Sequence, residues 1–222
     1  MIIKSGKLLI LFAMFVVNAY AQVINAGTVE GLPSVSIKDG KLFNGEKVEQ
    51  FIRNIEHELG ITMVWAAYPT MRLLSLTAMG KIDVIFPMGF SAQRDSLLQR
   101  SEPVYISHDC FVTKNLKVNN HDKSMVVGCK LGSPQETYLT THGYKINPTN
   151  SYEGLFEMLI QGRVPIIAIP INVYDELIPK YAHADLNSEV YLTREIGFYY
   201  SPNFSKAKEI DRAIKKYNGI FQ

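Results

Sequence analysis

Short apolar segments alternate with amphipathic segments along this chain, and this alternation restricts the fold more than any other feature. The apolar segments at 61–66, 82–86 and 164–169 have the length of buried β-strands. In residues 48–59 apolar side chains recur at helical spacing, and Gly60 follows as a helix stop. Buried strands that alternate with amphipathic helices predict mainly parallel sheets with helices on both faces.

The alternation runs through the chain twice. The first cycle ends with a strand predicted at 105–113, and the polar residues 114–124 follow as a candidate linker. The second cycle begins with a strand predicted at 125–129. The other predicted elements are helices at 70–79, 91–99, 133–142, 151–161, 173–181 and 205–217 and a strand at 196–200. Two cycles in 222 residues predict two α/β lobes, which bury a core without disulfides or metals.

The first 21 residues have the three-part pattern of a secretory signal peptide. Lys4 and Lys7 precede an apolar run at 8–17, and Ala19-Tyr20-Ala21 forms a cleavage site. The run is short for a membrane span, although an uncleaved anchor is an alternative. We therefore expect export to the bacterial periplasm and a mature chain without a membrane span.

Charge and composition exclude several classes of partner. Removal of the signal peptide lowers the 23 Lys and Arg residues to 21, which equals the 21 Asp and Glu residues. A neutral chain without a basic run has no electrostatic footprint for nucleic acid. The five histidines are scattered, so we expect neither a metal nor a cofactor, and we expect a monomer. Cys110 and Cys129 lie in apolar runs, either as a disulfide or as separate buried thiols.

Two helix starts are candidate binding sites. If Ser91 is an N-cap, Arg94 lies in the first turn, where the helix dipole disfavours a cation. A bound anion explains this placement, and so does a surface ion pair with Asp95 or Glu102. The second start, Ser133-Pro134-Gln135-Glu136, is a capping box directly after a predicted strand, where open α/β sheets bind ligands.

Four segments, taken in order, resemble one family. They are GKIDVIFPMGFSAQR at 80–94, SEPVY at 101–105, VVGCKLGS at 126–133 and LIQGRV at 159–164. Together they are similar to the family 3 extracellular solute-binding proteins, which are the polar-amino-acid type periplasmic binding proteins of ABC importers. The PTMR segment at 69–72 looks like a divergent branch of that family.

The resemblance implies an α/β, two-lobed periplasmic-binding-protein-like fold, with two mixed sheets flanked by helices and joined by a two-strand hinge. Lobe 1 would comprise residues 22–105 and 197–222, and lobe 2 residues 106–196. Arg94 would hold a ligand carboxylate, with Ser91 beside it and backbone N–H groups supplied by lobe 2. The complete predicted ligand-binding set is Arg94, Ser91, Gly89, Phe90, Gly132, Ser133, Tyr68 and Arg72.

The sequence departs from the family at three places. Pro165 and Pro170 stand where acidic residues often bind the ligand ammonium, and Leu32-Pro33-Ser34 replaces an early aromatic residue. The chain also ends at residues 219–222, where relatives continue into another helix. A buried ammonium without an acidic partner is unfavourable, so we expect a solute other than a standard amino acid.

Three functions are compatible with these residues. The first is capture of a small carboxylate-bearing solute for uptake through an ABC permease. The second is the same trap reporting to a membrane sensor, such as a histidine kinase or a diguanylate cyclase. The third, a dehydratase of prephenate-like acids, needs a general acid or base, for which Glu136, Glu102 and His108 are the candidates. No G-x-S-x-G or phosphate-binding loop occurs, so we expect a binding protein rather than an enzyme.

Overall fold

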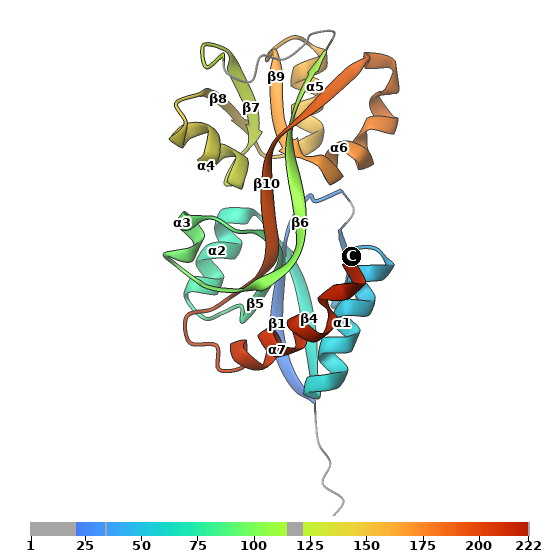
Figure 1. Ribbon diagram of the computed structural model, residues 1–222, viewed down its shortest axis with the longest axis vertical. Helices are drawn as coiled ribbons and strands as arrows, with labels where there is room; N and C mark the ends of the chain where they lie inside the picture. The colour runs from blue at the N-terminus through green and yellow to red at the C-terminus, as the bar shows by residue number, and fades with distance from the viewer. Residues whose placement is uncertain (1–20, 34, 115–121, 222) are drawn as a thin grey trace, which may run out of the picture.

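Two long strands join two α/β lobes, which lie one above the other in the computed structural model (Figure 1). The structure describes residues 21–33, 35–114 and 122–221. The two strands are β6 (Gln99–Lys114) and β10 (Leu186–Tyr200). The predicted two-lobed α/β fold is confirmed. Residues 1–20 of the predicted signal peptide and residues 115–121 of the predicted linker lie outside the described residues.

Lobe 1 is a mixed sheet covered by helices on both faces. β1 is parallel to both β4 and β5, and β10 pairs antiparallel with β5. Its elements are β1 (Gln22–Val29), β2 (Ser36–Lys38), β3 (Lys41–Phe43), α1 (Glu46–Leu59), β4 (Ile61–Tyr68), α2 (Thr70–Ala78), β5 (Val84–Gly89), α3 (Ala92–Asp95), α7 (Ala207–Tyr217) and η2 (Asn218–Phe221). Phe51, Phe86 and Phe198 pack in the core beneath α1 and α7. Leu73 and Tyr199 belong to the core on the opposite face, beneath α2.

Lobe 2 repeats this arrangement with β7 between β8 and β9, parallel to both. Its elements are β7 (Val126–Lys130), α4 (Pro134–Thr141), β8 (Lys145–Thr149), α5 (Tyr152–Ile160), β9 (Ile166–Pro170), α6 (Ile171–Leu177) and η1 (Ile178–Ala184). Phe156 of α5 packs against one face of the sheet with Ile167. Leu139 of α4 packs with Phe111 against the other face.

The crossing strands make one continuous sheet of the two lobes. β10 pairs with β5 in lobe 1, and β6 pairs with β9 in lobe 2. The resulting order is β4-β1-β5-β10-β6-β9-β7-β8, and β2 and β3 form a separate pair. Tyr105 of β6 lies opposite Ile196 of β10. The predicted lobe boundaries, after residue 105 and after residue 196, therefore lie at the same level of the two crossing strands. The division of the chain into lobes at these residues stays a prediction.

Several elements differ from the sequence prediction. β6 begins six residues before the strand predicted at 105–113, the helix predicted at 173–181 is α6 followed by η1, and β1, β2, β3 and β8 were not predicted. The helix predicted at 91–99 is only α3, because the chain enters β6 at Gln99. The strand predicted at 196–200 is 15 residues long and begins at Leu186. Residues 186–195 are mostly exposed and carry no apolar alternation, and their antiparallel pairing with β6 holds them in a strand.

The two cysteines are separate buried thiols. Cys110 lies opposite Ile169 of β9, and Cys129 lies opposite Ala168 of the same strand. β9 therefore separates their strands by two sheet spacings, about 10 Å, which is beyond the reach of a disulfide. Adjacent residues of a strand point to opposite faces, so the two thiols also face different cores. Burial raises the pKa of each thiol to about 12.

Candidate functional site

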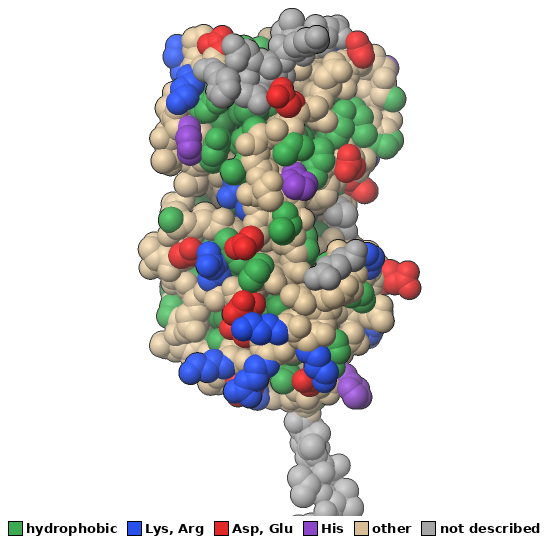
Figure 2. All heavy atoms as spheres, viewed as in Figure 1, with side chains coloured by type: hydrophobic (Ala, Val, Ile, Leu, Met, Phe, Trp, Pro, Cys, Tyr) green, Lys and Arg blue, Asp and Glu red, His purple; other side chains and the backbone are tan. Residues whose placement is uncertain are grey.

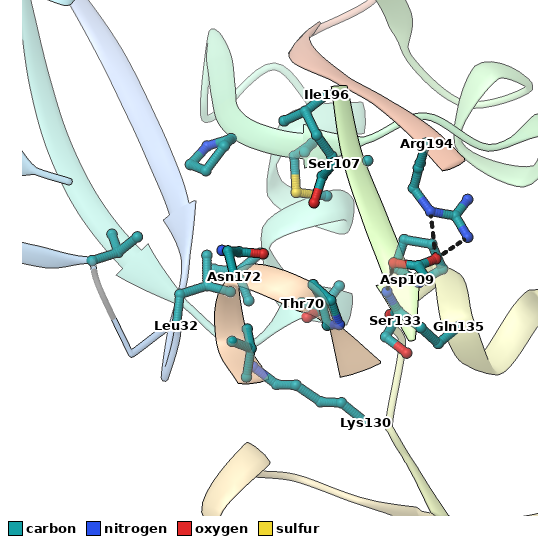
Figure 3. Close-up of a pocket in the computed structure, with 18 of the residues that line it drawn as sticks. Leu32, Thr70, Ser107, Asp109, Lys130, Ser133, Gln135, Asn172, Arg194 and Ile196 are labelled. Atoms are coloured by element: carbon teal, nitrogen blue, oxygen red, sulfur yellow. Dashed lines mark hydrogen bonds and ion pairs between the residues drawn. The ribbon is translucent and has the colours of Figure 1, made fainter. Parts of the chain in front are cut away.

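A cavity of about 110 Å³ lies between the lobes, beside the crossing strands. The first residues of four helices reach it: Thr70 of α2, Gln135 of α4, Tyr152 of α5 and Asn172 of α6. The N-terminal end of a helix carries a partial positive charge. Figure 3 shows Asp109, Ser133, Gln135 and Arg194 grouped on one side of this cavity.

Arg94 connects the two lobes at the cavity. Its Nη1 donates to the carbonyl oxygen of Gly89 in lobe 1 at 2.7 Å, and its Nη2 donates to that of Gly132 in lobe 2 at 3.2 Å. The side chain is 5% exposed, and burial lowers its pKa to about 10, so the guanidinium stays charged at neutral pH. No further hydrogen bond of its guanidinium is found among the described residues.

Lys130, at the end of β7, is a second buried cation of the cavity. Its Nζ donates to the carbonyl oxygen of Glu30 in lobe 1 at 2.9 Å and lies 4.7 Å from the centre of the Tyr152 ring. Burial lowers the pKa of Lys130. In the described part of the chain, neither Lys130 nor Arg94 forms a salt bridge.

Asp109 of β6 is 2% exposed and makes the buried ion pair of the cavity. Its Oδ2 lies 2.7 Å from Nη2 and 3.0 Å from Nε of Arg194, which comes from β10. Its Oδ1 accepts a hydrogen bond from Nε2 of Gln135 at 2.6 Å. Burial raises the pKa of Asp109, and the Arg194 charge and both hydrogen-bond donors oppose this rise.

Direct contacts hold the lobes together over the cavity. Arg94 and Lys130 each donate from one lobe to a backbone carbonyl of the other. The hydroxyl of Thr137 in α4 also donates to Oε1 of Gln93 in α3 at 3.1 Å. The structure therefore represents a closed arrangement of the two lobes.

Solved structures match this fold, whereas no family model and no curated protein matches the sequence. An ancestral arginine-binding protein bound to arginine is similar with a TM-score of 0.75 at 20% identity, over 91% of this chain and 97% of that chain. The GluR0 ligand-binding core from Nostoc punctiforme, in complex with L-glutamate, reaches 0.75 at 19%, over 90% and 95%. ArtJ, the arginine-, lysine-, histidine-binding protein from Geobacillus stearothermophilus, reaches 0.74 at 14%, over 90% and 94%. The chain has the two-lobed fold of these binding proteins.

In this binding-protein fold, the predicted residues of lobe 1 lie in different surroundings. Gly89 and Arg94 line the cavity, whereas Ser91 caps α3 by accepting from the backbone N–H of Arg94 at 3.4 Å. Phe90 is buried in the lobe 1 core. Arg72 is exposed and its guanidinium lies 5.6 Å from the ring centre of Tyr68, a pair that does not line the cavity. The ligand-binding roles of all these residues stay predictions.

In lobe 2, Ser133 lines the cavity and is the N-cap of α4, accepting from the backbone N–H of Glu136 at 3.1 Å. The backbone N–H of Gly132, predicted to face a ligand, donates to the Glu136 carboxylate at 2.5 Å. The carbonyl of Gly132 accepts from Arg94. The helix start therefore forms as predicted, but its carboxylate bonds one residue earlier than in the usual capping box.

The predicted ligand-binding set lacks six charged or amide residues of the cavity, although Gln135 lies within the predicted helix start: Asn44, Asp109, Lys130, Gln135, Asn172 and Arg194. Asp109 and Lys130 are charges beside apolar strand residues, a signal that was available in the sequence. Arg194 lies in the part of β10 that no periodicity identifies. Asp109 lies directly opposite Pro170 across the β6–β9 ladder. The cavity therefore has a carboxylate on the strand next to Pro170, the position at which the resemblance places an acidic residue.

The candidate catalytic groups lie away from the cavity lining. Glu102 forms a surface ion pair with Lys215, and His108 is exposed with its Nδ1 3.1 Å from the Thr193 hydroxyl. Glu136 is bonded to Gly132. The described residues contain no group of three His, Cys, Asp or Glu side chains suited to a metal. They also contain no helix long and apolar enough to cross a membrane.

Proposed function

We propose that this protein binds a small carboxylate-bearing solute between its lobes, in the periplasm, and delivers it to an ABC permease. The general role of solute binding rests on the fold, because the similar structures are amino-acid-binding proteins and ligand-binding cores. We infer that the solute is an anion from one observation, which is the charge balance of the buried cavity.

Arg94, Lys130 and Arg194 bring three positive charges to the cavity, and Asp109 brings one negative charge. Arg194 is paired with Asp109, so Arg94 and Lys130 remain with backbone carbonyls as their hydrogen-bond acceptors. The exposed surface differs from the cavity: on the face shown in Figure 2, charges of both signs mix over lobe 1 near α7. A buried charge without a counter-ion is unfavourable, and an anion between the lobes neutralises this excess.

The size of the cavity restricts the solute. A cavity of about 150 Å³ holds benzene, with six carbon atoms. The present cavity of about 110 Å³ is of the same order, so it suits a small solute in the closed arrangement. A short carboxylic acid meets both the size and the charge of the site.

Signalling to a membrane sensor is the alternative use of the same site. Two of the similar structures are described as a ligand-binding core and a ligand binding domain. Both uses need a trap that closes on a solute, and neither needs catalysis. Neighbouring genes for a permease and an ATPase favour uptake, whereas a neighbouring membrane sensor gene favours signalling.

A thermal-shift screen tests the proposed anion specificity. The purified protein is heated with organic acids, amino acids and polyamines at matched ionic strength. A solute at about 100 times its dissociation constant adds about 2.7 kcal/mol of stability, or on the order of 5–10 °C for a chain of this size. We expect short organic acids to give such shifts. Stabilisation by polyamines and not by acids contradicts an anion site.

A further inference from the structure

Asp109 is the only carboxylate that lines the cavity within the described residues, and Arg194 already occupies it. Both Nε and Nη2 of Arg194 donate to Oδ2 (Figure 3), and Gln135 donates to Oδ1. The protein therefore supplies donors to both carboxylate oxygens. A ligand ammonium, which needs a carboxylate partner when it is buried, finds none that is available.

The position of Arg194 is fixed by lobe 1 as well as by Asp109. Its Nη1 donates to the carbonyl oxygen of Phe90 at 3.2 Å. Gly89 leaves space for its side chain, because a Cβ atom at Gly89 would lie 2.5 Å from Cδ of Arg194. The Arg194 side chain is 12% exposed. The bonds to Asp109, the bond to Phe90 and the space left by Gly89 thus hold this guanidinium on Asp109. An incoming cation must displace a pre-organised partner.

Gln135 indicates what the solute carries in place of an ammonium. Its Nε2 must face Asp109, because the carboxylate needs a donor, so the orientation of the amide is determined. Its Oε1 is buried in the cavity wall without a hydrogen-bond partner among the described residues. A hydroxyl group donates to this oxygen without adding a fourth positive charge beside Arg94, Lys130 and Arg194.

We propose that Arg194 determines the specificity of the cleft: by occupying Asp109, it selects carboxylates that carry a neutral hydroxyl over carboxylates that carry an ammonium. The solute class is then a short hydroxy acid rather than an amino acid. This inference rests on the proposed binding of a carboxylate and names the second group that the solute presents.

Matched pairs of solutes test the inference by calorimetric titration of the purified protein. Glycolate and glycine, lactate and alanine, and malate and aspartate differ by hydroxyl against ammonium on one carbon. We expect the hydroxy acid of the best-binding pair to bind at least tenfold more tightly. In Arg194→Met, Asp109 becomes available to an ammonium, and this preference falls at least tenfold. Arg194→Lys keeps a cation beside Asp109 and keeps the preference.

The ratio of two affinities separates specificity from folding, because a partly unfolded sample lowers the binding capacity for both solutes alike. Equal or tighter binding of the amino acid by the natural protein overturns the inference and leaves the carboxylate site standing. An unchanged ratio in Arg194→Met overturns the role of Arg194. If no member of any pair binds, the proposed function fails for these acids, and the inference fails with it. If Arg194→Met does not fold, the ratio of hydroxy-acid to amino-acid affinity in the natural protein tests the inference by itself.

Discussion

Replacement of Arg94 by alanine is expected to weaken carboxylate binding at least 100-fold. A hydrogen bond to a charged group contributes about 1.5–3 kcal/mol, and a guanidinium makes two such bonds to one carboxylate. Two bonds therefore account for a loss of at least about 3 kcal/mol, or about 100-fold in affinity. The substitution also removes the bridge from Gly89 to Gly132 that holds the lobes closed. Calorimetric titration with the acid that gives the largest thermal shift measures the loss.

Arg53→Ala is the matched control for this prediction. It removes the same charge from the same lobe, but the Arg53 side chain is 61% exposed and pairs with Glu49 on α1, outside the cavity lining. We expect its affinity to stay within about twofold of the natural protein, as for an exposed charge. If Arg94→Ala binds the acid normally, the anion site lies elsewhere. If both variants lose affinity alike, net charge rather than the cavity governs binding.

Replacement of Asp109 by alanine is expected to lower the free energy of unfolding by about 3–5 kcal/mol, since removal of one partner leaves a buried charge uncompensated. Arg194 loses its carboxylate, and Nε2 of Gln135 loses its acceptor. The double variant Asp109→Leu, Arg194→Met removes both charges and is expected to recover most of this loss. Urea unfolding at neutral pH gives the three free energies.

The exposed pair of Lys216 and Glu58 is the control for burial. Its N–O distance is also 2.7 Å, but its side chains are 58% and 31% exposed. Lys216→Ala should therefore cost no more than about 1 kcal/mol. Equal losses of unfolding free energy in Asp109→Ala and Lys216→Ala would show that burial adds nothing to the Asp109 pair. If the double variant does not recover stability, the lost stability comes from packing.

The fold was predictable because apolar periodicity reports the elements that form each core. Most core strands and most helices follow that signal, although β1, which lies between β4 and β5, was not predicted. The N-caps Ser91 and Ser133 formed as their local sequences indicate. The first ten residues of β10 were not predictable, since they are exposed and depend on pairing with β6, some 80 residues away in the sequence.

The candidate site was predictable only in part, for a similar reason. Arg94 was singled out because a cation in the first turn of a helix opposes the dipole. Pro165 and Pro170 stand where the resemblance places acidic residues. Asp109, across the ladder from Pro170, and Arg194, on the other crossing strand, come together only when the two long strands pair. No local pattern reports such a long-range meeting of charges.

Binding of a negative charge in the cleft can be tested with a series of solutes that share one carbon skeleton. The best-binding acid, its primary amide and the corresponding amine have nearly the same shape and differ in charge. Calorimetric titration should show binding of the acid, with the amide and the amine each at least about 100-fold weaker, since both lose the charge-assisted hydrogen bonds to Arg94. An amide or an amine that binds as tightly as the acid would show that the cleft does not select a negative charge.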